Sequence, residues 1–410
     1  MANPTVPELA AAGTRTPKPV DGCRHPSVGL VAFAPLAWGT AWTSRNHVTM
    51  SLGRSVRAVW LSPAPEWRRA RPWKRVPADQ LGPVPPIPGF SVDHPRWHEV
   101  TAYRPAAFAD ALLRRRLRRV AASLRRGGCT RLIAYLWRSS YFRQSRLIPF
   151  DQTVIHLDDE HSFSEREQPV SEREAEALAA ADLVFLSSPR LVERKGRFNE
   201  RSYLFPNGVD LAWYREHARI PDDLAAIPEP RLGYTGFLRK MLDWPLLLEL
   251  ARRRPAWQFV FVGGQAGHEL PDEAERLRAL PNAHFLGYRQ SPEMVAYQQH
   301  FDVALLPYAV NAYTNCIFPV KLHEYLAAGA PTVGTPIRSL VDFRSVIEVA
   351  DGIDDWEAAI ERLLVPGQRD AARTATRRAT AGRYDWDRMA DAAAELMLSR
   401  LGLARDRGSR

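Results

Sequence analysis

The sequence contains few cysteines and no long apolar run. Only three of its 410 residues are cysteine, and Cys23, Cys129 and Cys316 are widely spaced. An odd, scattered set argues against a disulfide framework or a zinc site and fits a reducing compartment, so we expect a cytoplasmic protein. No apolar run reaches the roughly 20 residues that a membrane-spanning helix needs, and the best candidate, residues 28–42, is interrupted by proline and glycine.

Several recognition signals are also absent. There is no G-x-G-x-x-G and no G-x-x-x-x-G-K-[ST], so the dinucleotide oxidoreductase and P-loop classes lose their main support. Residues 1–27 lack the basic start and apolar centre of a signal peptide, and we interpret them as a disordered tail. No RNA- or DNA-binding motif is present, and we expect no nucleic-acid partner.

The composition is that of a globular protein with an excess of positive charge. Hydrophobic residues make up 45% and charged residues 25%, and 410 residues are enough for two or more domains. The net charge of +10, from 56 basic and 46 acidic residues, favours anionic partners such as phosphates or lipid headgroups. The sign of the charge does not choose among them.

Strand-like and helical segments alternate along most of the chain, which is typical of a parallel sheet. The first series predicts strands at 28–35, 56–63, 131–137, 152–157, 181–188 and 202–207, with helices at 106–126 and 171–180. The second series predicts strands at 231–238, 257–264, 283–288, 301–308 and 331–336, with helices at 243–254, 271–280, 291–300 and, in the tail, 354–400. We therefore predict an α/β protein with two Rossmann-like domains.

The expected boundaries follow from this alternation. We predict one domain over 28–208 and a second over 209–385, joined by a linker near 208–230. Residues 64–100 interrupt the first series with many prolines and three tryptophans, and they are predicted to form a long loop. Loops of that length are often functional.

Four glycines lie at the ends of strands in the second series, namely Gly236, Gly263, Gly264 and Gly287. In doubly wound sheets, ligands bind beyond the carboxyl ends of the strands, where glycine allows the backbone to approach a phosphate. The alternative is that these glycines only make turns.

The segment CIFPVKLHEYLAAGAPTVGTPI, residues 316–337, predicts a helix from about Pro319 to Ala328 that ends at Gly329. Lys321 then lies in the first turn, where a cation is unfavourable by up to about 1 kcal/mol unless an anion is bound there. A diphosphate would remove this conflict, and Glu324, one turn later, suits two ribose hydroxyls. The alternative is a solvated helix with a Lys–Glu pair.

A basic cluster occupies residues 114–126, beside an apolar stripe of Phe108, Leu112, Leu117, Val120 and Leu124. Residues 66–75 mix arginine, lysine and tryptophan in a similar way. Together they suit peripheral contact with an anionic membrane, at its inner face in a cytoplasmic protein. The alternative is an Arg-rich solvated helix beside an acceptor loop.

The order of GYTGFL, FVGG, NAHFLGY, FDVALLPY and PVKLHEYLAAGAPTVGTP resembles the nucleotide-sugar domain of GT-B-fold glycosyltransferases, in particular the retaining family-4-like group. In the first half, PLAWGTAWTSRNHVTMSLG, VIHLDDEHSFSE, EREAEALAAADLVFLSSPRLVERK and PNGVD match the order of bacterial polysaccharide members, of the teichuronic-acid type. The resemblance covers roughly residues 28–400. It implies two Rossmann-like domains that face each other across a cleft, with helix 386–400 packing back on the first domain.

The resemblance also implies a donor site. Glu324 matches the second glutamate of a Glu-x7-Glu motif and would contact the ribose, whereas Cys316 replaces the first glutamate. The backbone N–H of Phe318 would approach the phosphates, and Lys321 resembles the lysine of the polysaccharide subgroup. Tyr288 would meet the base through its backbone. Gly236 and Gly263 would approach the donor, and because Phe237 replaces the family's arginine, the missing charge would come from Arg239 or Lys240.

In the first half, the resemblance places His156 toward the donor sugar, with Asp159 nearby. The tryptophan–arginine segment and the following acid pair put Trp38, Gly39, Arg45 and Asp158 on the acceptor side. The alternatives are a helix cap with solvated acids or the metal-binding acids of GT-A enzymes. Two Rossmann-like halves argue against the second, and no metal is expected.

The implied reaction transfers a hexosyl or deoxyhexosyl group from a UDP-, GDP- or dTDP-linked donor to an acceptor hydroxyl, with retention and without a cofactor. Lys321, Arg239, His156 and Asp159 would be the catalytic residues. Polysaccharide, glycolipid or natural-product synthesis would use such an activity. A nucleotide-sugar epimerase and a non-catalytic nucleotide-sugar-binding protein remain alternatives.

Overall fold

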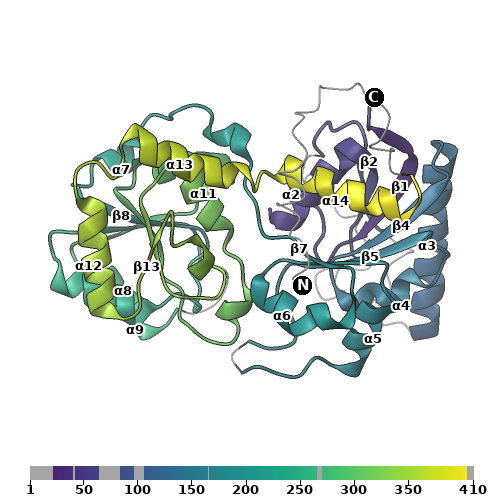
Figure 1. The fold of residues 1–410 in the computed structure, drawn as a ribbon, viewed down its shortest axis with the longest axis horizontal. Helices are drawn as coiled ribbons and strands as arrows, with labels where there is room; N and C mark the ends of the chain where they lie inside the picture. Colours follow the sequence, from purple (N-terminus) through teal and green to yellow (C-terminus); the bar gives the residue numbers. More distant parts are fainter. Residues whose placement is uncertain are drawn as a thin grey trace. The chain divides into compact units, whose positions relative to one another are not determined.

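The computed structural model describes residues 22–39, 42–63, 84–96, 106–164, 166–265 and 270–403. The chain divides into two compact units (Figure 1). Unit 1 comprises residues 1–159, 169–206 and 386–410, and unit 2 comprises 160–168 and 207–385. The structure therefore changes units at 206/207, where the sequence placed the boundary at 208/209, and it adds 160–168 to unit 2.

The sheet of unit 1 has seven strands in the order β3-β2-β1-β4-β5-β6-β7, and neighbouring strands run parallel. Helices cover both faces of a parallel sheet, so its strands are nearly continuous apolar runs that could be located from the sequence. The strands are β1 (His25–Phe33), β2 (Val56–Leu61), β3 (Phe90–Asp93), β4 (Arg131–Leu136), β5 (Gln152–Leu157), β6 (Leu183–Leu186) and β7 (Ser202–Leu204).

Two predictions for unit 1 need correction. Strand β3 lies within the predicted loop 64–100, because a four-residue edge strand between proline-rich segments gives little pattern to detect. Strand β1 begins at His25, inside the segment interpreted as a disordered tail. Residues 1–21 of that tail, and the basic and tryptophan-rich segment 66–75, lie outside the described residues.

The helices of unit 1 include one from the far end of the chain. They are α2 (Ser44–Ser55), α3 (Ala106–Arg126), α4 (Phe142–Ser145), α5 (Glu172–Ala180), α6 (Pro189–Lys195) and α14 (Trp386–Arg400). Helix α14 packs on α2 (Figure 1). Asp387 accepts a hydrogen bond from Ser51 Oγ at 2.6 Å, and Asp391 accepts one from Ser55 Oγ at 3.0 Å.

Helix α3 buries much of its apolar stripe and exposes most of its arginines. Leu117, Val120 and Leu124 are buried, and Arg116 is also buried, with its guanidinium bound to Asp93 at 2.7 Å. The C-terminal part of the stripe that suggested contact with a membrane surface therefore packs in unit 1, whereas Phe108 at its start is 46% exposed. No helix in the described part of the chain is long and apolar enough to cross a bilayer.

The sheet of unit 2 has six strands in the order β10-β9-β8-β11-β12-β13, again parallel. The strands are β8 (Arg231–Thr235), β9 (Gln258–Val262), β10 (Ala283–Gly287), β11 (Val303–Leu306), β12 (Thr332–Gly334) and β13 (Glu348–Val349). The helices are α7 (Asp222–Ala225), α8 (Trp244–Arg253), α9 (Asp272–Arg278), α10 (Ser291–His300), α11 (Val320–Ala328), α12 (Ile353–Leu364) and α13 (Ala371–Gly382).

Two segments at the edge of unit 2 lie side by side where the chain passes between the units. The N–H of Val209 donates to the carbonyl of Tyr384 at 2.9 Å, and Val209 forms a parallel bridge with Asp385. The Tyr384 ring stacks on His323 of α11, with centroids 3.9 Å apart. Both segments are thus attached to the helix that carries Lys321 and Glu324.

Candidate active site

Helix α11 begins one residue later than the sequence suggested. Pro319 is the N-cap, with an extended backbone, and Val320 is the first helical residue. No side chain caps the helix, and the N–H groups of Phe318, Val320 and Lys321 have no acceptor among the described residues. Unpaired N–H groups and the positive end of the helix dipole together favour an anion at this position.

Lys321 lies across the loop that follows β8. Gly236 has φ +119°, and a Cβ at this position would be 2.1 Å from Lys321 Cε and 2.5 Å from Nζ. A Cβ on Gly263 would in turn meet the carbonyl oxygen of Gly236 at 1.9 Å. The two predicted glycines are therefore required for close packing, and Gly236 makes the space that the lysine occupies.

The charge of Lys321 is only partly compensated. Its side chain makes no ion pair in the part of the chain that the structure describes, and Nζ lies 5.8 Å from the centroid of the Tyr234 ring. Burial lowers the pKa of Lys321 below its ordinary value, the carboxylate of Glu324 opposes this shift, and the charge of Arg239 adds to it. A bound anion would supply the missing compensation.

Glu324 is held in a buried polar network. Gln298 Nε2 donates to Glu324 Oε2 at 3.1 Å and to Thr235 Oγ1 at 3.0 Å, and Tyr214 donates to Gln298 Oε1 at 2.6 Å. Burial raises the pKa of Glu324, whereas Lys321 and the hydrogen bond from Gln298 lower it. The network fixes one carboxylate oxygen by a hydrogen bond.

The two cations expected after Gly236 are both exposed. Arg239 lies over the Phe237 ring, 5.5 Å from its centroid, and Lys240 is exposed beside it. The effect of Arg239 on the pKa of Lys321 indicates that Arg239 is within electrostatic reach of the phosphate end of the site.

Phe237 and Tyr288 form an exposed aromatic pair. Their side chains are 42% and 61% exposed, and the rings are nearly parallel, with an interplanar angle of 27° and centroids 6.5 Å apart. The Tyr288 carbonyl accepts a hydrogen bond from Arg289 Nη1 at 2.9 Å, and Arg289 is held by Asp223 at 2.8 Å. The feature presented to solvent is thus the pair of rings.

Cys316, which replaces a family glutamate, has no exposed surface. Phe318 is buried as well, and its carbonyl accepts a hydrogen bond from Asn207 Nδ2 at 2.6 Å. Asn207 belongs to the PNGVD segment, so that motif positions the residue before the N-cap of α11. Asn207, Gln298 and Phe237 were missed as site residues, because their contacts join segments far apart in the sequence.

His156 is enclosed in unit 1. It is 2% exposed, its Nδ1 lies 2.6 Å from the hydroxyl of Tyr135, and its ring stacks on Trp137 with centroids 4.5 Å apart. Burial lowers its pKa to about 3, Asp158 opposes this shift, and Arg45 adds to it. The imidazole is therefore neutral at physiological pH and lies beneath the surface.

The four acceptor-side residues separate into two groups. Arg45 and Asp158 form an ion pair at 2.7 Å, with side chains 11% and 9% exposed, so these two are brought together. Trp38 is 1% exposed and packs against Trp60, which makes its ring part of the core. Gly39 is exposed, with φ +87°, and Asp159 is half-buried after β5.

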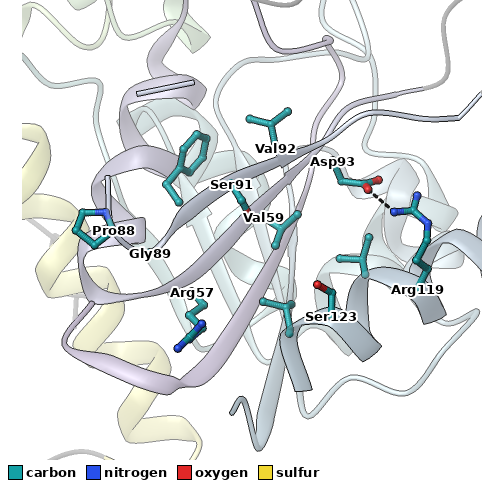
Figure 2. A pocket seen from close by; sticks show the side chains of 12 residues that line it. Arg57, Val59, Pro88, Gly89, Ser91, Val92, Asp93, Arg119 and Ser123 are labelled. Atoms are coloured by element: carbon teal, nitrogen blue, oxygen red, sulfur yellow. Dashed lines mark hydrogen bonds and ion pairs between the residues drawn. The ribbon is translucent and has the colours of Figure 1, made fainter. Parts of the chain in front are cut away.

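A cavity of about 330 Å³ lies elsewhere in unit 1, between strands β2 and β3 and helix α3 (Figure 2). Its charged lining includes Arg57, Asp93 and Arg119, and the last two are paired at 2.8 Å. None of the predicted site residues lines it. Among the described residues, no group of three or more His, Cys, Asp or Glu side chains could hold a metal ion.

Solved structures with this architecture include a trehalose-6-phosphate structure from E. coli bound with UDP-2-fluoro glucose and WaaG, a glycosyltransferase involved in lipopolysaccharide biosynthesis. The first has a TM-score of 0.60 at 11% identity, over 91% of this chain and 98% of that chain. WaaG has a TM-score of 0.54 at 13% identity, over 90% and 99%. The fold is that of the GT-B glycosyltransferases. This confirms the predicted fold class.

Sequence comparison extends the GT-B resemblance. Residues 229–365 match the family described as glycosyl transferases group 1. The teichuronic acid biosynthesis glycosyltransferase TuaH of Bacillus subtilis (strain 168) is 32% identical over 237 residues, 54% of this chain and 58% of TuaH. The glycosyltransferase EpsF of the same strain is 27% identical over 184 residues, 41% and 46% respectively. The chain thus spans about half the length of these relatives, and the predicted resemblance to the teichuronic-acid type is confirmed.

Proposed function

We propose that this protein transfers a glycosyl group from a nucleoside-diphosphate sugar to an acceptor hydroxyl, in the synthesis of a bacterial polysaccharide. The observation that carries this proposal is the start of α11, where Lys321, partly uncompensated, lies beside Gly236 and unpaired N–H groups. The match of residues 229–365 to group 1 glycosyltransferases supports it, as does the likeness to TuaH.

The chemistry follows from where charge develops. As the glycosidic bond to the leaving group breaks, negative charge grows on the diphosphate, and preorganised positive groups lower that barrier. Lys321 and the N–H groups near Phe318 provide these groups, and Arg239 adds a long-range charge. Glu324, fixed by Gln298, accepts hydrogen bonds from the ribose hydroxyls.

The base would lie against Phe237 and Tyr288. Two exposed rings at the carboxyl ends of β8 and β10 form a stacking surface next to the proposed phosphate site. The Tyr288 carbonyl accepts one hydrogen bond, from Arg289, and has a second lone pair, so the predicted backbone contact with the base can accompany stacking. Stacking suits any base, so UDP-, GDP- and dTDP-linked donors remain candidates.

The proposed reaction needs no metal and retains the configuration of the sugar. Lys321 and the helix dipole would take the role that a cation plays in metal-dependent transferases. In this scheme His156 and Asp159 act near the sugar. Because His156 is enclosed by Tyr135 and Trp137, it would reach a ligand only after a local rearrangement, or act through Asp158 and Arg45.

The decisive experiment is calorimetry with UDP, GDP and dTDP on the full chain, followed by transfer assays with EDTA present. Lys321→Ala and Glu324→Ala should each lose affinity for the preferred nucleotide and lose transfer. Arg344→Ala removes one exposed positive charge elsewhere in unit 2 and should change neither.

Three outcomes would contradict parts of this proposal. Full transfer by both site variants would refute the site, and loss of activity in EDTA would refute metal independence. Conversion of the donor alone, followed by NMR, would identify an epimerase instead.

We also propose that helix α3 contacts an anionic membrane electrostatically. Five of its arginines are exposed and form no ion pair with any described residue, namely Arg114, Arg115, Arg118, Arg125 and Arg126. Each basic residue near an anionic surface contributes about 1 kcal/mol, and salt screens the effect. Binding to phosphatidylglycerol vesicles should weaken with salt and in a triple Gln variant at 114, 115 and 118. Equal binding to neutral vesicles would refute this contact.

A further inference from the structure

Of the N–H donors of unit 1 that are buried without an acceptor in the described structure, three lie at the carboxyl ends of its strands. They are Arg45 Nε, Trp137 Nε1 and Arg138 Nε. A buried donor without a partner is unfavourable by about 1–3 kcal/mol, so native proteins rarely leave several together. Their occurrence at the carboxyl end of one sheet, where ligands bind in doubly wound folds, points to a missing acceptor.

The three donors belong to one cluster. Trp137 and Arg138 directly follow β4, whose neighbour β5 ends at Leu157, just before Asp158. Asp158 binds Arg45 at 2.7 Å, and the His156 ring connects the two strand ends by stacking on Trp137 at 4.5 Å.

Tyr141 is close enough to both arginines to feel their charge. Its hydroxyl lies 3.4 Å from the carbonyl oxygen of Ala34, at the end of β1. Burial raises the pKa of Tyr141, and the charges of Arg138 and Arg45 both oppose that shift. Both guanidinium groups are therefore within electrostatic reach of this phenol.

The two guanidinium groups of this cluster differ in their partners. Arg45 is neutralised by Asp158, whereas half-buried Arg138 has no ion pair and no side-chain hydrogen bond to any described residue. Glu174, which bonds to the neighbouring Ser139, is also held by Lys195 at 3.1 Å. The guanidinium of Arg138 therefore lies beside the fully buried indole of Trp137 without a counter-ion among the described residues. A partly buried cation is stabilised by an anionic partner.

We propose that Arg138, with Arg45 and Trp137, binds an anionic group of the acceptor, a carboxylate or a phosphate. Guanidinium presents a fork of donors that matches both groups, and the indole N–H adds a donor without charge. The assignment to the acceptor rests on the proposed function, in which unit 2 binds the donor. The anion site itself stands on the geometry of unit 1. A neutral acceptor would leave Arg138 uncompensated.

The test is ligand-observed NMR titration of the full chain with glucuronate, glucose 6-phosphate and glucose. Saturating UDP occupies the donor phosphate site, so that any anion effect is read at unit 1. At least one of the two anions should bind about tenfold or more tightly than glucose. Preference for glucuronate would identify a carboxylate as the anionic group, and preference for glucose 6-phosphate would identify a phosphate. Arg138→Ala should abolish this preference, and Arg138→Lys should keep part of it.

A matched control and three outcomes complete the design. Arg146 is an exposed arginine that directly follows helix α4 and lies over the ring of Phe142 in that helix. The Arg146→Ala variant should leave the preference for anions unchanged. Equal affinity for glucose and both anions overturns the proposal, as does an Arg138→Ala variant that behaves like Arg146→Ala. If anion preference survives while Lys321→Ala has no effect on UDP binding or transfer, the donor site fails and the anion site stands.

Discussion

The side chain of Lys321 occupies the space that a Cβ at Gly236 would need, with Cε only 2.1 Å from that position. Gly236 adopts φ +119°, a region that other residues rarely enter. The lysine and the glycine are therefore one structural unit, although 85 positions separate them in the sequence. The proposed anion site depends on both.

Gly236→Ala should damage the proposed phosphate site more than the fold. The new methyl group displaces Lys321, so affinity for UDP should fall at least about tenfold, and backbone strain should lower the free energy of unfolding by about 1–3 kcal/mol. Calorimetry and urea denaturation measure the two effects. Gly264→Ala is the matched control, since its Cβ would meet Tyr288 Cβ at an ordinary 3.6 Å. Unchanged UDP affinity in Gly236→Ala would contradict the role of this contact.

Nucleotide binding should be accompanied by proton uptake at alkaline pH. Burial lowers the pKa of Lys321 in the free protein, and a bound diphosphate would raise it again. Affinity should therefore decrease as the pH rises through the lowered pKa of the free lysine. Calorimetry in buffers of different ionisation enthalpy measures the uptake. Lys321→Arg stays charged and should show none, so equal uptake in both proteins would exclude Lys321 as the source.

Removing the exposed aromatic pair should separate binding of the base from binding of the phosphates. Phe237→Ala with Tyr288→Ala should weaken UDP by about 1–3 kcal/mol, the range measured for a base stacked on aromatic side chains. Affinity for inorganic pyrophosphate should stay the same, because Lys321 and the N–H groups of α11 are untouched. Val365→Ala removes an equally exposed apolar side chain and serves as the control. Parallel losses for UDP and pyrophosphate would mean that the rings support the loop instead.

Local pattern was enough to locate most strands and the start of α11. Buried parallel strands read as apolar runs, and the predicted helices at 106–126 and 291–300 agree with α3 and α10. Lys321 could be singled out because its position conflicts with the helix dipole, which is a local rule. Strand β3 could not be predicted, because four residues are too few to show a periodic pattern.

The environment of the site residues could not be predicted in the same way. Trp38 and His156 were placed near ligands by family resemblance, yet both are buried in the core of unit 1. Whether a side chain at a strand end points outward or inward depends on neighbouring strands. The contacts of Lys321 with Gly236 and of Glu324 with Gln298 join separate segments for the same reason.

Two buried histidines should make the protein sensitive to mild acid. Burial lowers the pKa of His156 and of His323 to about 3, against an ordinary value of 6.5. The unfolded chain binds protons as the pH falls below 6.5 while the folded chain does not, so the free energy of unfolding should decrease from there toward pH 3. Each histidine contributes up to about 1.4 kcal/mol per pH unit in that window.

His323→Phe should reduce this acid sensitivity in unit 2. Both ring nitrogens of His323 are buried without a partner in the described structure, so phenylalanine loses no hydrogen bond and keeps the stacking on Tyr384. Urea denaturation at pH 7.5 and pH 5 should show a smaller difference in the variant than in the wild type. His217→Phe, at an exposed position, should keep the wild-type difference. An unchanged difference in His323→Phe would mean that this imidazole is hydrated and titrates normally in the folded protein.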